Sequence, residues 1–283
     1  MTKPLSKNML DALLALHRAP DALPLDRGTI KALVGRGLVD TNGNITPLGT
    51  IKAMERLPLR EQCQAISIGL STSPWDSDST PEIYCYNAFA QQGHIGSYCE
   101  GGGFGTAIKA LCLDALTEAS IFFGTCIDAR EDACLKGVVG LAHIEKAKLE
   151  TIPKLETILK QIQQTSKEKY LAAFSEIISY GLIREWYPGL SVEFADALFD
   201  AVPKAHFVRL AQWVSEAPEH RNGWPDLTLV KGGRLKFVEV KTTDKLHHSQ
   251  FVTIPALIRE IGADVSVLQL VSANNSFKPT LAD

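Results

Sequence analysis

The sequence predicts an α/β protein in which a mixed β-sheet is flanked by helices and preceded by a small helical domain. Apolar residues recur at helical spacing through most of the first 215 positions, and the pattern changes to short β-rich runs between 227 and 240. A polar, proline-containing stretch at 71–81 interrupts the helical pattern. With 45% apolar and 22% charged residues over 283 positions, the composition is that of a globular protein with a buried core.

Hydropathy and charge narrow the class of protein. No apolar run approaches the roughly 18 residues of a membrane-spanning helix, and the start, MTKPLSKNML, lacks the apolar segment of a signal peptide. We therefore expect a cytoplasmic protein with no membrane partner. The net charge is −3, yet residues 1–60 contain nine Lys/Arg against five Asp/Glu. This basic excess fits either a DNA-contacting surface or an ordinary solvated face.

Residues 1–70 are expected to form a winged-helix-like domain. Apolar positions at helical spacing predict a helix over 5–17, and a second short helix is expected over 29–36. Asn42-Gly43 then has the composition of a two-residue hairpin turn, and a third helix follows the turn. Domains with this order of elements often place a helix in the major groove of DNA, but they also serve as protein-interaction modules.

Residues 71–81 (STSPWDSDSTP) are expected to be a linker, and residues 82–215 a helical region. Six cysteines are present without any Cys-x-x-Cys pair, so we expect buried apolar side chains rather than metal ligands. Helices are expected at 101–119, 131–160, 168–186, 192–199 and 207–214.

Residues 216–275 are expected to form the catalytic core. Short β-rich runs at 227–230 and 235–240 flank Gly232-Gly233, which predicts a hairpin of two strands. A helix over 249–261 and a strand over 265–271 complete the predicted core.

Three residues of this hairpin suggest phosphodiester chemistry. Asp226 precedes the first strand, and the turn brings Glu239 of the second strand back beside it. Residues two apart on a strand share a face, so Lys241 points the same way as Glu239. Carboxylate oxygens suit Mg²⁺ or Mn²⁺, the Val240 carbonyl could add a ligand, and Lys241 could act as the catalytic lysine. The alternative is a solvent-facing Glu–Lys pair on an edge strand.

The segment GWPDLTLVKGGRLKFVEVKTTDKLHHSQ resembles the VRR-NUC branch of the restriction-endonuclease-like PD-(D/E)XK nucleases. The resemblance rests on Pro225-Asp226-Leu227 and on Val238-Glu239-Val240-Lys241, with Asp244, Leu246 and Gln250 in step. The serine of the family pattern is His247 here, which puts a role for that hydroxyl in doubt. The resemblance implies a restriction-endonuclease-like core and a metal-dependent DNA nuclease.

A second segment, CEGGGFGTAIKALCLD, is similar to the Glu-Gly helix of the Fanconi-associated nuclease family. Glu100, Gly101, Phe104 and Asp114 carry this similarity, which implies that Glu100 is a metal ligand together with Asp226 and Glu239. The glycines would let backbone and DNA approach closely. The alternative is that Glu100 is simply a favourable acid at a helix start. Glu168 or Glu176 could also supply the upstream carboxylate, but their neighbours lack the glycine-rich context, so we expect both to be surface acids.

Four polar residues near the hairpin are candidate substrate contacts: Arg221, Lys245, His247 and Gln250. The expected function is hydrolysis of branched or flap-containing DNA in repair, close to the nucleoid. Two alternatives stay open, a sequence-specific restriction nuclease and a DNA-binding regulator whose nuclease core is inactive.

Overall fold

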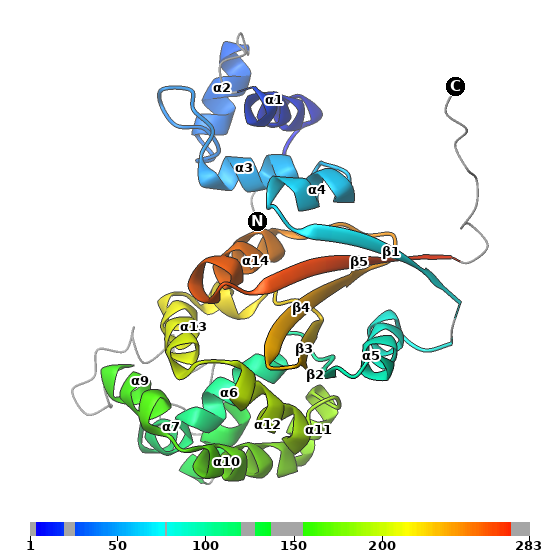
Figure 1. The fold of residues 1–283 in the computed structure, drawn as a ribbon. Coiled ribbons are helices and arrows are strands. Elements are labelled where there is room, and N and C mark those ends of the chain that lie inside the picture. The colour runs from blue at the N-terminus through cyan, green and yellow to red at the C-terminus, as the bar shows by residue number, and fades with distance from the viewer. Residues whose placement is uncertain (1–3, 20–25, 77, 120–127, 137–154, 273–283) are drawn as a thin grey trace.

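A computed structural model describes residues 4–19, 26–76, 78–119, 128–136 and 155–272. Within these residues a five-stranded sheet lies at the centre of the molecule, between the N-terminal helices and a larger helical layer (Figure 1). The predicted α/β class, a mixed sheet flanked by helices, is confirmed. None of the described helices is long and apolar enough to cross a membrane.

The strand order is β1-β5-β4-β3-β2, so β4 is the central strand. β4 runs parallel to β5 and antiparallel to β3, with Leu227 opposite Val238. The predicted hairpin between β3 and β4 is confirmed, and Gly232 and Gly233 supply the positive φ angles of 55° and 72° that its turn requires. The strands are β1 (Gly69–Trp75), β2 (Ile95–Ser97), β3 (Leu227–Lys231), β4 (Arg234–Lys241) and β5 (Asp264–Ser272).

The predicted linker at 71–81 is wrong, because residues 71–75 belong to β1. This strand pairs in parallel with β5, from Gly69 opposite Ser266 to Trp75 opposite Ser272. Its sequence is polar because β1 is an edge strand with mostly exposed or half-exposed side chains. The sheet therefore draws strands from beyond the predicted core at 216–275, since β1 and β2 both precede it.

Most of the helices form two groups on either side of the sheet, and the helix at 81–91 lies apart from both, beside β2 (Figure 1). Residues 129–136 are also helical, and residues 137–154 of the expected helix at 131–160 lie outside the described residues. The bounds are α1 (Lys7–Arg18), α2 (Arg27–Val34), α3 (Pro47–Met54), α4 (Leu59–Ala65), α5 (Pro81–Gln91), α6 (Gly102–Leu111), α7 (Leu113–Ala119), α9 (Leu155–Gln164), α10 (Lys167–Ser179), α11 (Gly181–Trp186), α12 (Val192–Ala201), α13 (Lys204–Glu216), the 3-10 turn η1 (Pro218–Arg221) and α14 (His248–Ile261).

Helix α6 connects the helical layer to the sheet through Phe104. This side chain is fully buried, and its ring centroid lies 4.9 Å from that of Phe207, 5.7 Å from that of Trp224 and 6.0 Å from that of Phe237. Phe237 belongs to the central strand, so α6 packs on the strand that carries Glu239. The expected helix at 101–119 is divided at Cys112, whose φ of −129° ends α6 before α7 begins.

Helices α1–α3 pack around a small hydrophobic core of their own. The turn between α2 and α3 is closed by a single bridge, Val39 to Ile45, and by Asp40, whose carboxylate accepts hydrogen bonds from the backbone of Asn42 and Asn44. The predicted order of helix, helix, bridged turn and helix is observed. Helix α4 instead joins the main core of the protein through Leu59 and Cys63.

Gln62 of α4 links the N-terminal helices to the segment that follows β4. Its side chain is fully buried. The amide Nε2 donates to the Met54 carbonyl at 3.1 Å, and Oε1 accepts from the Leu246 backbone N–H at 2.9 Å. The Leu246 N–H is therefore satisfied by this side chain, and the Met54 carbonyl, which also accepts from the Leu57 N–H at 3.0 Å, gains a second donor.

Replacing Gln62 with Ala should lower the free energy of unfolding by about 1–3 kcal/mol, because the buried Leu246 N–H loses its hydrogen-bond partner. Urea denaturation measures the change. Gln64→Ala, at an exposed position of the same helix, is the matched control and should change stability by less than about 0.5 kcal/mol. Equal stability of the two variants would contradict the proposed role of Gln62.

Candidate active site

The candidate site lies where β3 begins and β4 ends. Because the two strands are antiparallel, the residue before β3 stands beside the end of β4. Asp226 Oδ2 accepts a hydrogen bond of 2.7 Å from the Val240 backbone N–H. The backbone carbonyl of Asp226 accepts another, of 3.1 Å, from the N–H of Glu100. The two distant segments that carry the predicted residues therefore meet at Asp226.

Glu239 and Lys241 form a buried ion pair. Lys241 Nζ lies 2.8 Å from Glu239 Oε1, and the side chains are only 5% and 1% exposed. The interpretation of these residues as a solvent-facing pair on an edge strand is wrong, since β4 is the central strand and both side chains are covered. A buried ion pair costs desolvation energy that a surface pair does not, so its retention here suggests a functional role.

Two further side chains hold this pair in place. Asp244 Oδ2 lies 3.0 Å from Lys241 Nζ, which gives the lysine a second carboxylate partner. Gln250 of α14 donates from Nε2 to Glu239 Oε1, and its Oε1 accepts from the His247 backbone N–H at 2.9 Å. Gln250 is buried and bound to the protein through both atoms of its amide. The sequence predicts a substrate contact for Gln250, and this geometry supports instead a role in holding Glu239 in position.

Glu100 stands directly before α6 in a left-handed conformation, with φ of 48°. Its side chain is exposed. The glycines that follow serve internal packing, because a Cβ at Gly101 would meet the Trp224 ring and one at Gly102 the Tyr187 ring. A Cβ at Gly103 would meet Ser97 Oγ. Internal packing therefore requires glycine at these three positions, because protein side chains occupy the space that a Cβ would need.

Burial and mutual repulsion shift the protonation of the two central carboxyls. Burial and the nearby Glu239 carboxylate together raise the pKa of Asp226 to about 8, against the opposing effects of the Val240 N–H and Lys241. Burial also raises the pKa of Glu239, against the opposing effect of Lys241. Burial alone would lower the pKa of Lys241, but Glu239 and Asp244 outweigh it and raise that pKa. A cation at this site would allow both carboxyls to be charged together.

The carboxylate oxygens of the site have the chemistry that a divalent cation needs. Glu239 Oε2 is buried and has no hydrogen-bond partner, which is costly for a carboxylate oxygen unless a ligand satisfies it. Two hard oxygen donors, from Asp226 and Glu239, suit Mg²⁺ or Mn²⁺. No three His, Cys, Asp or Glu side chains among the described residues stand close enough together to enclose an ion. The Asp226 and Glu239 carboxylates therefore fit a divalent cation, and Glu100 lines the same hollow as Asp226.

The remaining predicted contacts lie around this centre. Lys245 is exposed and donates to the Arg56 carbonyl at 3.4 Å. His247 is 68% exposed and caps the N-terminus of α14. Arg221 lies on the other side, in a hollow of about 450 Å³ whose lining includes Glu100 and Lys109. These three cationic or ionisable side chains therefore surround the carboxylates rather than converge on one point.

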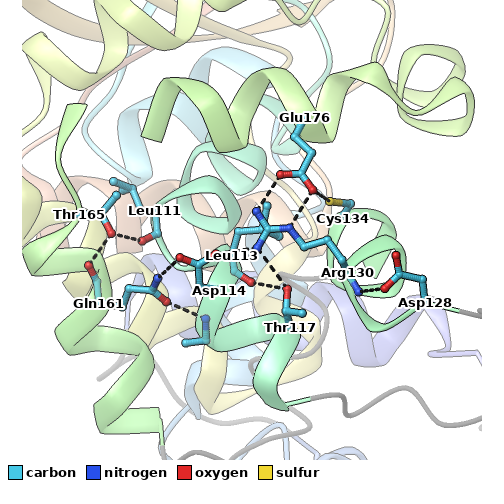
Figure 2. Close-up of polar contacts among 11 residues, drawn as sticks. Leu111, Leu113, Asp114, Thr117, Asp128, Arg130, Cys134, Gln161, Thr165 and Glu176 are labelled. Atoms are coloured by element: carbon cyan, nitrogen blue, oxygen red, sulfur yellow. Dashed lines mark hydrogen bonds and ion pairs between the residues drawn. The ribbon is translucent and has the colours of Figure 1, made fainter. Parts of the chain in front are cut away.

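Glu176 is not available as the upstream carboxylate. Arg130 donates to both of its oxygens, at 2.8 and 2.7 Å, and also contacts Asp114 at 2.6 Å (Figure 2). Asp114 comes from the segment that resembles the Fanconi-associated nuclease family, and Arg130 from the helical residues 129–136 that follow it. Their ion pair fastens these helices together, which gives both residues a structural role.

Sequence reasoning missed Glu82 and Gln62. Glu82 lies in the first turn of α5 and lines a hollow of about 400 Å³ together with Glu100 and Asp226. The signal for Glu82 was Thr80-Pro81-Glu82, which has the composition of a helix N-terminus. Nothing in the local sequence marks Gln62, because its partner Leu246 lies 184 residues away.

Comparison with known proteins finds solved structures with a similar fold. No protein-family model matches the sequence, and no relative was found among curated proteins. Two crystal structures of paFAN1 are similar, one bound to 5′ flap DNA with a 2-nt flap and a gap and one with a 1-nt flap and a gap. Their TM-scores are 0.56 and 0.54, and their sequence identities 17% and 18%. Each match covers 93% of this chain and 48% of paFAN1, so the chain spans about half the length of that protein.

The raised pKa of Asp226 predicts a pH-dependent cost of folding. An acid with a folded pKa of about 8 and an ordinary value of 3.8 loses stability as pH rises between these values, because the folded state resists its ionisation. In EDTA, Asp226→Asn should therefore be more stable than the wild-type protein near pH 8. We expect a free energy of unfolding that is higher by roughly 1 kcal/mol or more, which raises Tm by a few °C. The difference should shrink toward pH 4.

Thermal denaturation across this pH range measures the effect. Asp264→Asn is the matched control, because Asp264 is 64% exposed and paired with Lys236 at the other end of β4. This control should show no gain near pH 8. A gain of the same size in both variants would contradict the assignment to Asp226.

Proposed function

We propose that this protein is a metal-dependent nuclease that hydrolyses phosphodiester bonds in DNA. The observation that carries this proposal is the cluster of the buried Glu239–Lys241 pair with the half-buried Asp226 at the end of the central strand, in which Glu239 Oε2 has no partner. A vestigial core in a DNA-binding regulator would have no need to keep two carboxyls and a lysine buried together at a cost in folding energy.

Mg²⁺ or Mn²⁺ would be held by Asp226 and Glu239, with the Val240 carbonyl and Glu100 as further ligands. When bound, the ion supplies positive charge against the phosphate and acidifies water, which is the chemistry that phosphodiester hydrolysis requires. The residues of the chain prepare this site. Gln250 fixes the orientation of Glu239, and Asp244 holds the Lys241 ammonium close to the carboxylates.

Lys241 is the proposed catalytic lysine. Its ammonium is held charged by Glu239 and Asp244, so it can donate a hydrogen bond to a phosphate oxygen or orient the attacking water. Arg221, Lys245 and His247 surround the centre and are proposed to contact the DNA backbone.

Branched or flap-containing DNA is the proposed substrate, with a role in DNA repair inside the cell, close to the nucleoid. The likeness of the fold to paFAN1, which was crystallised with 5′ flap DNA, supports this choice. The basic excess of residues 1–60 is consistent with a DNA contact by the N-terminal helices.

Purified protein with Mn²⁺ should cut flap or forked DNA, at positions set by the branch rather than by sequence. Glu239→Gln and Lys241→Met should each lower the rate by at least about 100-fold, because each removes charge stabilisation from the reacting phosphate. Asp264→Asn should retain activity. Cuts at fixed sequences would indicate a restriction nuclease, and no cutting of any DNA by the wild-type protein would contradict the proposal.

Glu100 and Glu82 can be distinguished as the third carboxylate by Mn²⁺ binding, measured calorimetrically without DNA. Both side chains line the same hollow beside Asp226. Glu100→Gln should weaken binding by about 10- to 100-fold, whereas Glu82→Gln should change it by less than about threefold. The reverse order would make Glu82 the ligand and leave Glu100 as a helix-start acid.

A further inference from the structure

The described chain exposes few large apolar side chains, and most of them cluster. Leu182 is 46% exposed, Trp186 53% and Val192 40%, and all three lie in α11 and at the start of α12. Leu182 and Trp186 are four residues apart on α11, so they share a helix face. An exposed tryptophan in an apolar patch is unusual on a soluble surface and indicates a binding surface.

Trp186 has no hydrogen bond, ring contact or cation–π contact within the described part of the chain, whereas Trp213 and Trp224 are buried in contacts with other rings. Trp186 also lines the 400 Å³ hollow whose other side is formed by Glu100 and Asp226. The exposed indole and the proposed metal ligands therefore belong to one continuous depression.

The walls of this hollow are aromatic and rigidly placed. Tyr187 packs against Gly102, and Tyr98 packs against Gly189, because a Cβ at either glycine would meet a tyrosine ring. Tyr98 in turn lies 5.1 Å from Tyr86 between ring centroids. The turn after α11 is thus held by two ring-on-glycine contacts, which fixes the position of Trp186 at the mouth.

The charges of the hollow favour a neutral occupant beside the indole. Its ionisable lining consists of the carboxylates Glu82, Glu100 and Asp226 together with Cys99, Tyr98 and Tyr187, and it includes no lysine or arginine. A phosphate could approach the carboxylates only together with a cation. A flat uncharged ring, by contrast, could lie on Trp186 without electrostatic cost.

We propose that Trp186 is a stacking platform for an unpaired nucleobase next to the cleaved phosphate. This inference rests on the proposed nuclease function and adds the reason for a preference for branched substrates: a base can reach the indole only where it is not stacked in a duplex. Stacking on an aromatic side chain tolerates any base, so the platform would select DNA structure and not sequence.

The test measures binding of the whole chain in Ca²⁺, so that a divalent cation is present, by fluorescence anisotropy, to a 5′ flap duplex, to an oligothymidylate and to a blunt duplex. Trp186→Ala should weaken binding to the first two by about fivefold to a hundredfold and leave the blunt duplex unchanged. Trp186→Phe should restore most of the affinity, because a ring is kept. Leu182→Ala is the matched control, on the same helix face but outside the hollow, and should behave as the wild-type protein.

Intrinsic fluorescence gives a second readout. Oligothymidylate should quench the emission of the wild-type protein, and Trp186→Phe should lose this quenching. Equal loss of affinity for all three DNAs on Trp186→Ala, or unchanged affinity for all, would overturn the inference. So would a homodimer of the wild-type protein that Trp186→Ala dissociates, because the patch would then be a self-interface.

The two proposals fail separately. If the wild-type protein cuts no DNA but Trp186→Ala selectively loses flap and oligothymidylate binding, the platform stands and the nuclease assignment falls. If the wild-type protein cuts flap DNA and Trp186→Ala binds and cuts it equally well, the platform falls and the nuclease assignment stands.

Discussion

The arrangement of this protein depends on keeping two carboxyls and one ammonium group out of water at the end of a central strand. Asp226, Glu239 and Lys241 are brought together by the antiparallel register of β3 and β4. Each needs a partner there, because an unpaired buried charge is far more costly than a paired one. Val240 N–H, Gln250 and Asp244 supply those partners, and Glu239 Oε2 is left without one.

Several elements far from the hairpin serve this requirement. Helix α14 carries Gln250, and the segment before it is held to the N-terminal helices by Gln62. On the other side, α6 packs through Phe104 on the central strand and places Glu100 at the rim of the carboxylates. The N-terminal helices therefore do more than precede the core, because one of their side chains supports the segment that presents Asp244.

The accuracy of the sequence predictions follows the strength of the local signal. The β3–β4 hairpin was predictable because Gly232-Gly233 separates two β-rich runs, and α12 and α13 because their apolar spacing is regular. Strand β1 was mistaken for a linker because an edge strand has polar positions. Strand β2 has only three residues and was missed, since its place is set by pairing with β3 and not by its own composition.

The sequence by itself determined the hairpin, its carboxylates and lysine, and the shared face of Glu239 and Lys241, because turn chemistry and the two-residue period of a strand are local properties. Only the tertiary structure decided that β4 is central, that the Glu239–Lys241 pair is buried, and that Glu176 is committed to Arg130 while Glu100 contacts Asp226. Burial and partner choice depend on segments more than a hundred residues apart, and no local pattern encodes which of them meet.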